Sequence, residues 1–340
     1  MQAVQYRAFG KGPELVDVDK PKPGPGEVLL KITASGLCHS DEVVMSFPED
    51  GYPYPMPMTL GHEPAGIVEE LGEGATGVEV GDSVIVYGCW GCGVCAMCAD
   101  GRENLCLTGM VSPGLGVDGA MAEYMVVDTP RHLVPIGDLD PVRAASLTDA
   151  ALTPYEAIKK VLPHLTGGST AVVIGAGGLG HVAIQLLRTL TSARIIALDV
   201  GEEKLAFARE MGAHETLESD ADAAGKIKEM TGGIGADVVF DFVGIDPTGA
   251  TATAAVKVAG AIVAVGAGGG SVKVGLLSAP YDVEVRSSLW GTRASLLELV
   301  EMAKRGEIAI ETKEYPISEA VQAYADLHEG KIRGRGVIIP

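Results

Sequence analysis

The feature that most constrains this fold is an apolar, strand-like run that turns through glycines into a helical stretch. Residues 170–174 are followed by Gly175-Ala-Gly-Gly-Leu-Gly180 and then by a helical pattern over 179–190. Similar runs, with helical stretches such as 202–211 between them, occur at 194–198, 237–240 and 261–265. Apolar strands that alternate with helices are typical of parallel βαβ units covered on both faces. We therefore predict a doubly wound α/β domain in this part of the chain.

The glycine turn has the G-x-G-x-x-G spacing of a dinucleotide site. Such glycines allow a tight turn and the close approach of a pyrophosphate, which the helix N-terminus then stabilises. Asp199 ends the next apolar run, where a carboxylate accepts the ribose hydroxyls and repels a 2′-phosphate. A structural turn beside a solvated aspartate is the alternative. The pattern favours NAD over NADP, with turn contacts at Gly175, Gly177, Gly178, Leu179 and Gly180.

Residues 1–140 have a different pattern, in which short alternating runs are divided by proline and glycine. This pattern predicts a β-rich domain with long connections. After Gly266 the alternation of strands and helices ends, and amphipathic helices near 294–304 and 319–329 indicate a return to the first domain. We predict one domain from 1–146 and 288–340 and a second domain from 147–287.

Five of the six cysteines lie between positions 89 and 106. The spacing Cys92-x2-Cys95-x2-Cys98-x7-Cys106 supplies four thiolates that can surround one tetrahedral ion, which is the ligand set of a structural zinc site. Cys89 adds another overlapping CxxC pair, so spacing alone leaves it as a possible ligand. A redox dithiol is the competing interpretation, but the thioredoxin-like βαβ context of such pairs is absent.

A second set of metal-binding side chains lies earlier in the chain. Cys38 stands in Gly36-Leu-Cys-His-Ser-Asp41, and His62 stands in Gly61-His-Glu-Pro64. A catalytic zinc takes three protein ligands and keeps one open position. A lone cysteine or histidine is more often a packed core residue, and the residues alone leave the third ligand open.

In chain order, the segments 36–41 and 61–64, the four cysteines and the glycine turn resemble the zinc-dependent medium-chain alcohol dehydrogenases over essentially the whole chain. The resemblance implies a GroES-like catalytic domain, a Rossmann domain, NAD, and one catalytic and one structural zinc ion. Cys38 and His62 would hold the catalytic zinc, Glu63 could approach it, and Asp41 would orient His62. Asp149 stands where the family commonly has a cysteine, so either Asp149 or Glu63 would complete the shell. A Cys, His and Asp set resembles the branch that often prefers secondary alcohols.

The resemblance also implies roles for single residues around the reaction. Ser40 would take the proton of the alcohol hydroxyl, and Thr153 would contact the nicotinamide. Lys204 would contact the adenosine ribose, while His39 and Arg335 would contact the pyrophosphate. The segments that flank the substrate channel contribute Tyr54, Leu115 and Trp290.

The implied function is the reversible oxidation of alcohols to ketones or aldehydes with NAD, with hydrophobic, secondary alcohols as the favoured substrates. A polyol dehydrogenase of the sorbitol type and a non-catalytic scaffold that binds zinc and NAD are the alternatives. The formal net charge of −19 disfavours nucleic acid and membrane surfaces as partners. We expect a cytoplasmic location, because the sequence starts without a basic and then apolar segment. On analogy with the family we also expect a dimer or tetramer.

Overall fold

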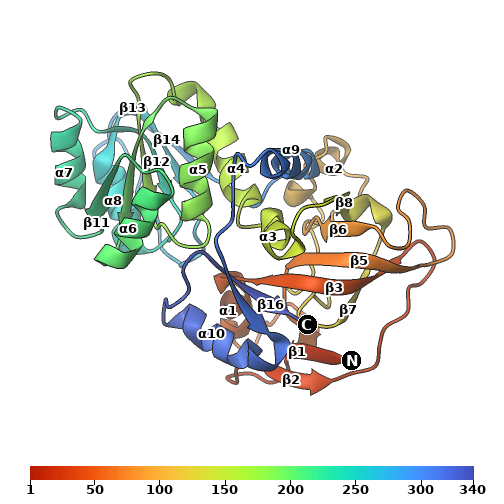
Figure 1. Ribbon diagram of the computed structural model, residues 1–340. Helices are drawn as coiled ribbons and strands as arrows, with labels where there is room; N and C mark the ends of the chain where they lie inside the picture. The colour runs from red at the N-terminus through yellow and green to blue at the C-terminus, as the bar shows by residue number, and fades with distance from the viewer. The chain divides into compact units, whose positions relative to one another are not determined.

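The computed structural model describes all 340 residues, which form two compact units (Figure 1). The first unit contains Met1–Leu152 and Thr292–Pro340, and the second contains Thr153–Gly291. The predicted boundary lies at 146/147, whereas the second unit begins at Thr153. Residues just before Thr153 are tied to the first unit, since the Ala150 N–H donates to Glu63 Oε1 at 3.1 Å.

The second unit is built on a six-stranded parallel sheet. Its strand order is β11-β10-β9-β12-β13-β14. The strands are β9 (Thr170–Ile174), β10 (Arg194–Asp199), β11 (Glu215–Glu218), β12 (Ala236–Asp241), β13 (Val256–Ala264) and β14 (Glu284–Ser287). The chain direction across the sheet reverses between β9 and β12, and ligands of such sheets bind at the carboxyl ends of the strands there. The prediction of a doubly wound, Rossmann-type sheet is confirmed.

Helices connect these strands and cover the sheet. They are α4 (Leu152–Lys159), α5 (Gly180–Leu190), α6 (Glu202–Glu210), α7 (Ala223–Met230) and α8 (Asp246–Ala255). Ile227 of α7 and Ala252 of α8 pack with Val172 and Ile174 of β9 in one apolar cluster. Helix α5 contacts β9 and β10, and in Figure 1 the strands lie between α7 and α5. Every residue of β9 is buried, as expected for a strand covered on both faces.

The first unit is β-rich. Its larger sheet has the order β15-β16-β3-β5-β6-β8, and β7 also pairs with β3. The strands are β3 (Val28–Leu37), β5 (Glu63–Leu71), β6 (Ser83–Val86), β7 (Tyr124–Val127), β8 (Leu133–Pro135), β15 (Thr312–Pro316) and β16 (Arg335–Ile339). A smaller sheet contains β1 (Gln2–Tyr6), β2 (Glu14–Asp17) and β4 (Met58–Thr59). Strand β16 pairs antiparallel with β3, so a strand from the C-terminal end of the chain lies beside one from its N-terminal part.

The helices of the first unit range from 4 residues in α2 to 12 residues in α9. They are α1 (His39–Ser46), α2 (Ala96–Ala99), α3 (Pro141–Ala145), α9 (Arg293–Lys304) and α10 (Ala320–His328). Helices α9 and α10 form where the amphipathic patterns near 294–304 and 319–329 were found. Tyr324 of α10 joins Leu37, Leu60 and Met121 in a buried apolar cluster. None of the helices has both the length and the apolar character needed to cross a membrane.

Candidate metal and coenzyme sites

Two strand ends bring Cys38 and His62 together. Cys38 follows β3 and caps α1, and His62 directly precedes β5. The two strands are antiparallel, with Gly36 opposite Glu63, so the end of one lies beside the start of the other. A Cβ atom on Gly36 would lie 1.7 Å from Glu63 Oε2, so only glycine leaves room for that carboxylate. Cys38 and His62 are both buried.

Asp149 joins this pair from a distant part of the chain. It follows the 3-10 helix Ser146–Thr148, and its Oδ2 lies 3.6 Å from Cys38 Sγ and 3.7 Å from His62 Nε2. One ligand atom from each residue lies within 4.8 Å of the other two, and all three residues are buried. Zinc is bound in proteins by sulfur, nitrogen and carboxylate oxygen, and three such ligands leave a fourth position for substrate. The donor set therefore fits a catalytic zinc ion.

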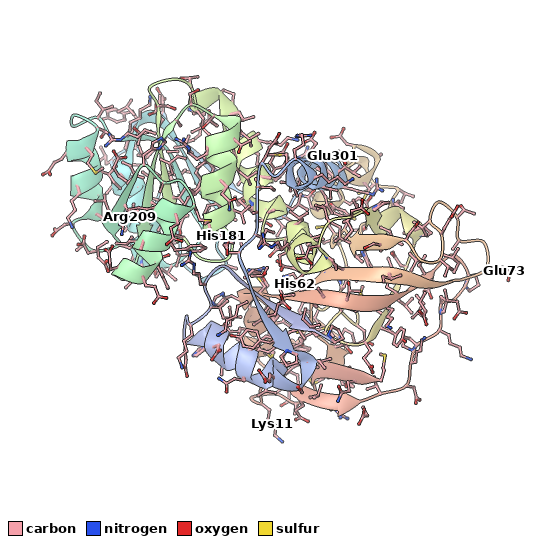
Figure 2. The ribbon with its side chains drawn as sticks, in the orientation of Figure 1. Lys11, His62, Glu73, His181, Arg209 and Glu301 are labelled. Atoms are coloured by element: carbon pink, nitrogen blue, oxygen red, sulfur yellow. The ribbon has the colours of Figure 1, made fainter.

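Asp41 orients the imidazole of His62 (Figure 2 labels His62). Asp41 Oδ1 lies 3.0 Å from His62 Nδ1, which leaves Nε2 toward Asp149. The other carboxylate oxygen of Asp41 accepts the Cys38 N–H at 3.3 Å and the Tyr324 hydroxyl at 3.1 Å. A carboxylate behind a ligating histidine fixes the ring and raises its basicity. Sequence reasoning missed Tyr324, which stands on α10 and has no local motif.

The electrostatics of this cluster favour positive charge. Burial by itself would lower the pKa of His62, but the carboxylates of Asp41 and Asp149 outweigh it and raise that pKa well above its usual range. A metal ion competes with the proton for the same ring nitrogen. A buried group of a thiol and two carboxylates around one imidazole is therefore a site that a dication would neutralise.

Glu63 and Arg335 form a buried ion pair beside this trio. Arg335 Nε donates to Glu63 Oε2 at 3.0 Å, and Nη2 donates to Glu63 Oε1 and, at 2.9 Å, to Asp149 Oδ2. Burial alone would lower the pKa of Arg335, but Cys38, Glu63 and Asp149 raise it well above its usual range. In this structure Glu63 is held by Arg335, while Asp149 reaches both Cys38 and His62. The predicted contact of Arg335 with pyrophosphate stays a prediction.

Ser40 and His39, the first two residues of α1 after Cys38, differ in solvent exposure. Ser40 is half-buried, with its Oγ 3.5 Å from Cys38 Sγ. The side chain of His39 is 68% exposed, and its Nε2 lies 3.9 Å from Glu42 Oε2. The placement of Ser40 suits a role at a ligand bound beside Cys38, and the exposure of His39 leaves its ring accessible to an anion.

The predicted substrate-channel residues belong to both units. Tyr54 and Leu115 are partly buried and pack against the apolar cluster that contains Leu60 in the first unit. Trp290 and Thr153 are buried in the second unit, and Thr153 stands in the first turn of α4. Their predicted contacts with substrate and nicotinamide stay predictions.

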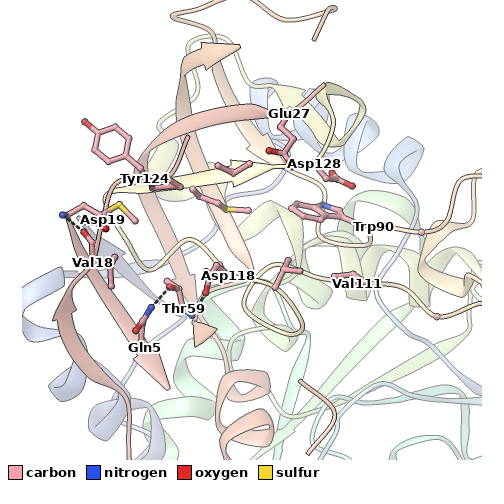
Figure 3. Close-up of a pocket in the computed structure, with 18 of the residues that line it drawn as sticks. Gln5, Val18, Asp19, Glu27, Thr59, Trp90, Val111, Asp118, Tyr124 and Asp128 are labelled. Carbon is pink, nitrogen blue, oxygen red and sulfur yellow. Dashed lines mark hydrogen bonds between the residues drawn. The ribbon is translucent and has the colours of Figure 1, made fainter. Parts of the chain in front are cut away.

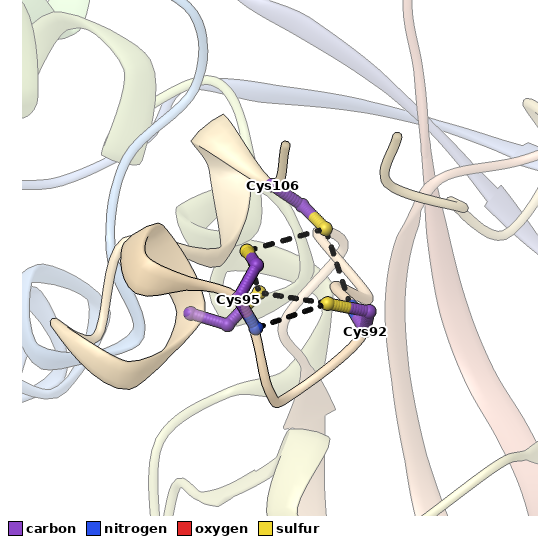
Figure 4. A group of neighbouring side chains, drawn as sticks. Cys92, Cys95 and Cys106 are labelled. Atoms are coloured by element: carbon purple, nitrogen blue, oxygen red, sulfur yellow. Dashed lines mark hydrogen bonds between the residues drawn. The ribbon is translucent and has the colours of Figure 1, made fainter. Parts of the chain in front are cut away.

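The four cysteines form a compact cluster (Figure 4). Cys95 Sγ lies 3.5 Å from Cys98 Sγ and 3.9 Å from Cys106 Sγ, and Cys92 Sγ lies 3.9 Å from Cys98 Sγ. Hydrogen bonds from Thr108 and from backbone N–H groups lower the pKa of Cys92 to about 6, whereas burial raises the pKa of Cys98 to about 12. The four sulfurs fit the tetrahedral thiolate set of a structural zinc ion.

Cys89 lies outside that cluster. It is buried, and the group of four converging sulfurs does not include it. Burial raises the pKa of the Cys89 thiol well above its usual range, against the effect of a hydrogen bond with Tyr87. The geometry therefore separates Cys89 from the overlapping CxxC pairs that the sequence shows.

The glycine turn of the second unit is shaped for a pyrophosphate. Gly175 follows β9 with a φ of 88°, a conformation that favours glycine. A Cβ atom on Gly180 would lie 1.7 Å from the Gly175 carbonyl oxygen, so the helix can start here only with glycine. A Cβ atom on Gly177 would meet nothing within 4 Å, which leaves that face of the turn open to a ligand. These are the three roles of the glycines in dinucleotide-binding turns.

Asp199 ends β10 beside this turn. Its Oδ2 accepts the Ala176 N–H at 2.7 Å, and its Oδ1 accepts the Val200 N–H at 2.7 Å. Lys204 Nζ lies 3.6 Å from Asp199 Oδ1. The carboxylate and the ammonium group are thus both present at the position expected for an adenosine ribose.

A cavity of ≈ 760 Å³ lies elsewhere in the first unit (Figure 3). Its lining includes Trp90 and the carboxylates of Asp19, Glu27, Asp118 and Asp128. Asp118 accepts the Thr59 N–H at 2.7 Å, and Gln5 donates to the Thr59 hydroxyl at 3.2 Å. Cys38, His62 and Asp149 do not line this cavity, so it is separate from the candidate catalytic metal site.

Both halves of the chain match known domain families. The alcohol dehydrogenase GroES-like domain matches residues 24–138, and the zinc-binding dehydrogenase domain matches residues 178–305. The NAD-dependent alcohol dehydrogenase of Sulfurisphaera tokodaii is 36% identical over 354 residues, which is 100% of each chain. The chain belongs to the zinc-dependent medium-chain alcohol dehydrogenase family. The GroES-like and Rossmann domains predicted from the sequence are confirmed.

Other relatives of this alcohol dehydrogenase show the range of the family. The D-arabinose 1-dehydrogenase (NADP(+)) of Saccharolobus solfataricus is 34% identical over 343 residues, covering 100% of this chain and 97% of that protein. The crystal structure of the alcohol dehydrogenase from Aeropyrum pernix has a TM-score of 0.93 at 34% identity, with 100% of both chains covered. The acetophenone reductase from Geotrichum candidum, solved with NAD, has a TM-score of 0.86 at 31% identity, covering 100% of this chain and 97% of that one.

These relatives confirm the enzyme class predicted from the sequence. The protein is an alcohol dehydrogenase of the zinc-binding type, and relatives named NAD-dependent alcohol dehydrogenase match its whole length. The matching domain is named for zinc binding, and these alcohol dehydrogenase relatives are named for NAD.

Proposed function

We propose that this dehydrogenase oxidises secondary, hydrophobic alcohols reversibly to ketones with NAD, at a zinc ion held by Cys38, His62 and Asp149. The observation that carries the proposal is the convergence of one sulfur, one nitrogen and one oxygen donor within 4.8 Å at a buried point. Glu63 is the alternative third ligand. Arg335 donates to both carboxylates, but only Asp149 joins Cys38 and His62 in the convergent group, while Glu63 also accepts the Ala150 N–H.

The residues around this point have distinct tasks in the reaction. When bound, zinc supplies Lewis acidity, which makes the deprotonated form of an alcohol accessible at neutral pH. Asp41 holds His62 by its Nδ1, so the ring presents Nε2. Ser40 Oγ, 3.5 Å from Cys38 Sγ, takes the hydroxyl proton and passes it toward solvent.

We propose a second zinc ion at Cys92, Cys95, Cys98 and Cys106. Four thiolates leave no open position, so this ion stabilises the loop and takes no part in the reaction. Two zinc ions per chain are therefore expected, and Cys89 binds neither. Zinc analysis of the purified protein, by mass spectrometry under native conditions, tests this count.

We propose that the coenzyme is NAD rather than NADP. A 2′-phosphate would meet the Asp199 carboxylate, which is held in place by two backbone N–H groups. The relative from Saccharolobus solfataricus, whose name specifies NADP, shows that both coenzymes are used among proteins of this similarity. Equal efficiency with NAD and NADP would contradict this part of the proposal.

The substrate class is tested by comparing alcohols directly. The apolar surroundings of Tyr54 and Leu115 support neutral, hydrophobic substrates. A polyol or sugar is the second candidate, because one relative is named for D-arabinose. NADH formation is measured from a secondary alcohol, its primary isomer, sorbitol and D-arabinose at equal concentration. A preference for the secondary alcohol supports the proposal, and a preference for sorbitol or the sugar contradicts it. No turnover with any of them in zinc-loaded protein would favour the non-catalytic scaffold.

We further propose that the protein is a homo-oligomer. Strand β14 forms the edge of the six-stranded sheet, and an exposed edge strand is a template for pairing with another chain. Val285 of this strand is exposed, as are Val258 of β13 and Tyr281. The Ala259 N–H donates to the Tyr281 carbonyl at 2.9 Å, so the segments of Val258 and Tyr281 lie together. Sedimentation of the protein and of a Val285→Asp variant tests this edge. A monomeric wild-type protein would contradict it.

A further inference from the structure

A second carboxylate lies beside Asp199 at the proposed adenosine end of the coenzyme site. Glu218 ends β11, and the parallel register places it directly opposite Asp199 on β10. Neighbouring strands lie about 4.8 Å apart, so the two residues share one edge of the sheet. Glu218 is exposed, as a residue that borders a ligand site would be.

The Glu218 carboxylate accepts a hydrogen bond from a backbone N–H of the loop after Asp199. Its Oε1 and Oε2 accept the Gly201 N–H at 3.1 and 3.2 Å. Gly201 caps α6 with a φ of 88°, which turns its N–H out of the helix. Asp199 accepts the Val200 N–H in the same loop. The two carboxylates therefore occupy two successive loop amides, which are the kind of donor that holds a phosphate at a helix N-terminus.

The charges around this loop are mostly negative. Glu202 and Glu203 stand in the first turn of α6, close in sequence to Asp199. Two cations oppose these four carboxylates, because Lys204 Nζ lies 3.6 Å from Asp199 Oδ1 and Arg209 pairs with Glu202. A 2′-phosphate carries more than one negative charge at neutral pH and is usually met by an arginine in NADP sites. In this loop the Val200 and Gly201 N–H groups already donate to Asp199 and Glu218, so a 2′-phosphate would meet two carboxylates instead of two free amide donors.

We infer that Glu218 is a second determinant of coenzyme specificity, which rejects NADP together with Asp199. The inference rests on the proposed coenzyme site. Glu218 acts in two ways, because it adds a negative charge near the ribose 2′ position and keeps the Gly201 N–H from a 2′-phosphate. Removal of the Asp199 charge alone therefore leaves the site closed to NADP, and removal of both charges opens it.

Binding of coenzyme fragments tests this inference without turnover. Adenosine 5′-monophosphate carries the ribose with a free 2′-hydroxyl, and adenosine 2′,5′-bisphosphate carries the 2′-phosphate. Calorimetry gives the ratio of the two dissociation constants for the wild-type protein, Asp199→Asn, Glu218→Gln and the double variant. Glu218→Ala also frees the Gly201 N–H. Glu229→Gln, an exposed carboxylate of α7, is the control with the same change in net charge.

We expect Glu218→Gln to shift the ratio toward the bisphosphate by roughly tenfold, as the loss of one nearby charge predicts. Glu218→Ala should shift it further, the double variant should exceed Asp199→Asn by a similar factor, and Glu229→Gln should leave it unchanged. A double variant with the ratio of Asp199→Asn alone would overturn the role of Glu218. Wild-type protein that binds neither fragment would instead refute the coenzyme site itself, and with it this inference.

Discussion

The two candidate zinc sites of the first unit differ in how the chain builds them. The four cysteines come from one short segment, 92–106, and backbone N–H groups of that segment donate to their sulfurs, such as Cys95 N–H to Cys92 Sγ at 3.4 Å. Cys38, His62 and Asp149 come from three segments that only the folded sheet brings together. Cys92 is exposed, whereas all three residues of the trio are buried.

This difference separates a site set by local geometry from one set by the whole fold. Turns within 92–106 suffice to gather four thiolates, so the cysteine cluster supports its own loop. The trio needs the β3–β5 pairing and the ties of Glu63 to Ala150 and Arg335. We therefore expect that loss of the cysteine cluster mainly lowers the stability of the fold. Loss of the Cys38, His62 and Asp149 trio mainly abolishes the reaction.

The largest effect is expected for Cys38→Ser. The variant should lose one zinc per chain and lower kcat by roughly a thousandfold, because the Lewis acid contributes several kcal/mol to the transition state. It should remain folded, since the cysteine cluster keeps its ion. Zinc analysis, turnover and circular dichroism check the three statements. Cys89→Ala, a change at another buried cysteine, is the control and should keep both ions. A Cys38→Ser protein with both zincs and full rate would refute the assignment.

The reverse pattern is expected for Cys95→Ser. This variant should lose the other zinc and lower Tm by at least about 5 °C, because a structural zinc contributes folding free energy directly. Its kcat at a temperature below the transition should stay within about threefold of wild type, since this ion has no open position for substrate. Calorimetric unfolding and turnover on the same sample check both. Loss of turnover with an unchanged Tm would reverse the roles of the two sites.

A smaller effect is expected for Tyr324→Phe. The Tyr324 hydroxyl holds Asp41, which in turn holds His62, so its loss should weaken zinc binding at the trio by roughly tenfold, as outer partners of ligands do. Competition with a chelator measures that affinity. Tyr315→Phe removes another buried tyrosine hydroxyl, which bonds Asp326, and is the control. Equal affinities for the two variants would remove Tyr324 from the metal site.

The smallest effect is a pH dependence of the metal-free protein. The pKa of His62 is raised in the folded state, so protonation of the ring stabilises the fold. That stability is fully present below the unfolded-state pKa of about 6.5 and is lost as pH rises through the higher folded-state pKa. Tm of the metal-free protein should therefore fall as pH rises above neutrality. The zinc-loaded protein should lack this fall, because zinc replaces the proton on the ring. Parallel profiles would contradict the assignment of His62.

The same contrast explains what the sequence alone could predict. Local spacing reveals the glycine turn before α5 and the four cysteines, because each motif is closed within a few residues. The parallel sheet is visible because strands covered on both faces are apolar throughout, as β9 is. The third ligand could not be chosen from spacing, since Asp149 and Glu63 both carry a carboxylate. Arg335 contacts both carboxylates, and only the folded positions distinguish them, since Asp149 Oδ2 lies 3.6 Å from Cys38 Sγ and 3.7 Å from His62 Nε2.

Long-range contacts account for the other residues that sequence reasoning missed. Tyr324 reaches Asp41 across 283 residues, and no pattern in α10 marks it apart from its apolar neighbours. Glu218 lies opposite Asp199 only because β10 and β11 are parallel and in register. Side chains of this kind have no spacing signal, so they are found only when the sheet that places them is known.

Anomalous diffraction at the zinc absorption edge tests the central claim most directly. Crystals of the zinc-loaded protein should show two peaks per chain. One should lie within bonding distance of Cys38 Sγ, His62 Nε2 and Asp149 Oδ2, and the other among the four cysteine sulfurs. A single peak at the cysteines, or a peak bound by Glu63 in place of Asp149, would contradict the proposed catalytic site.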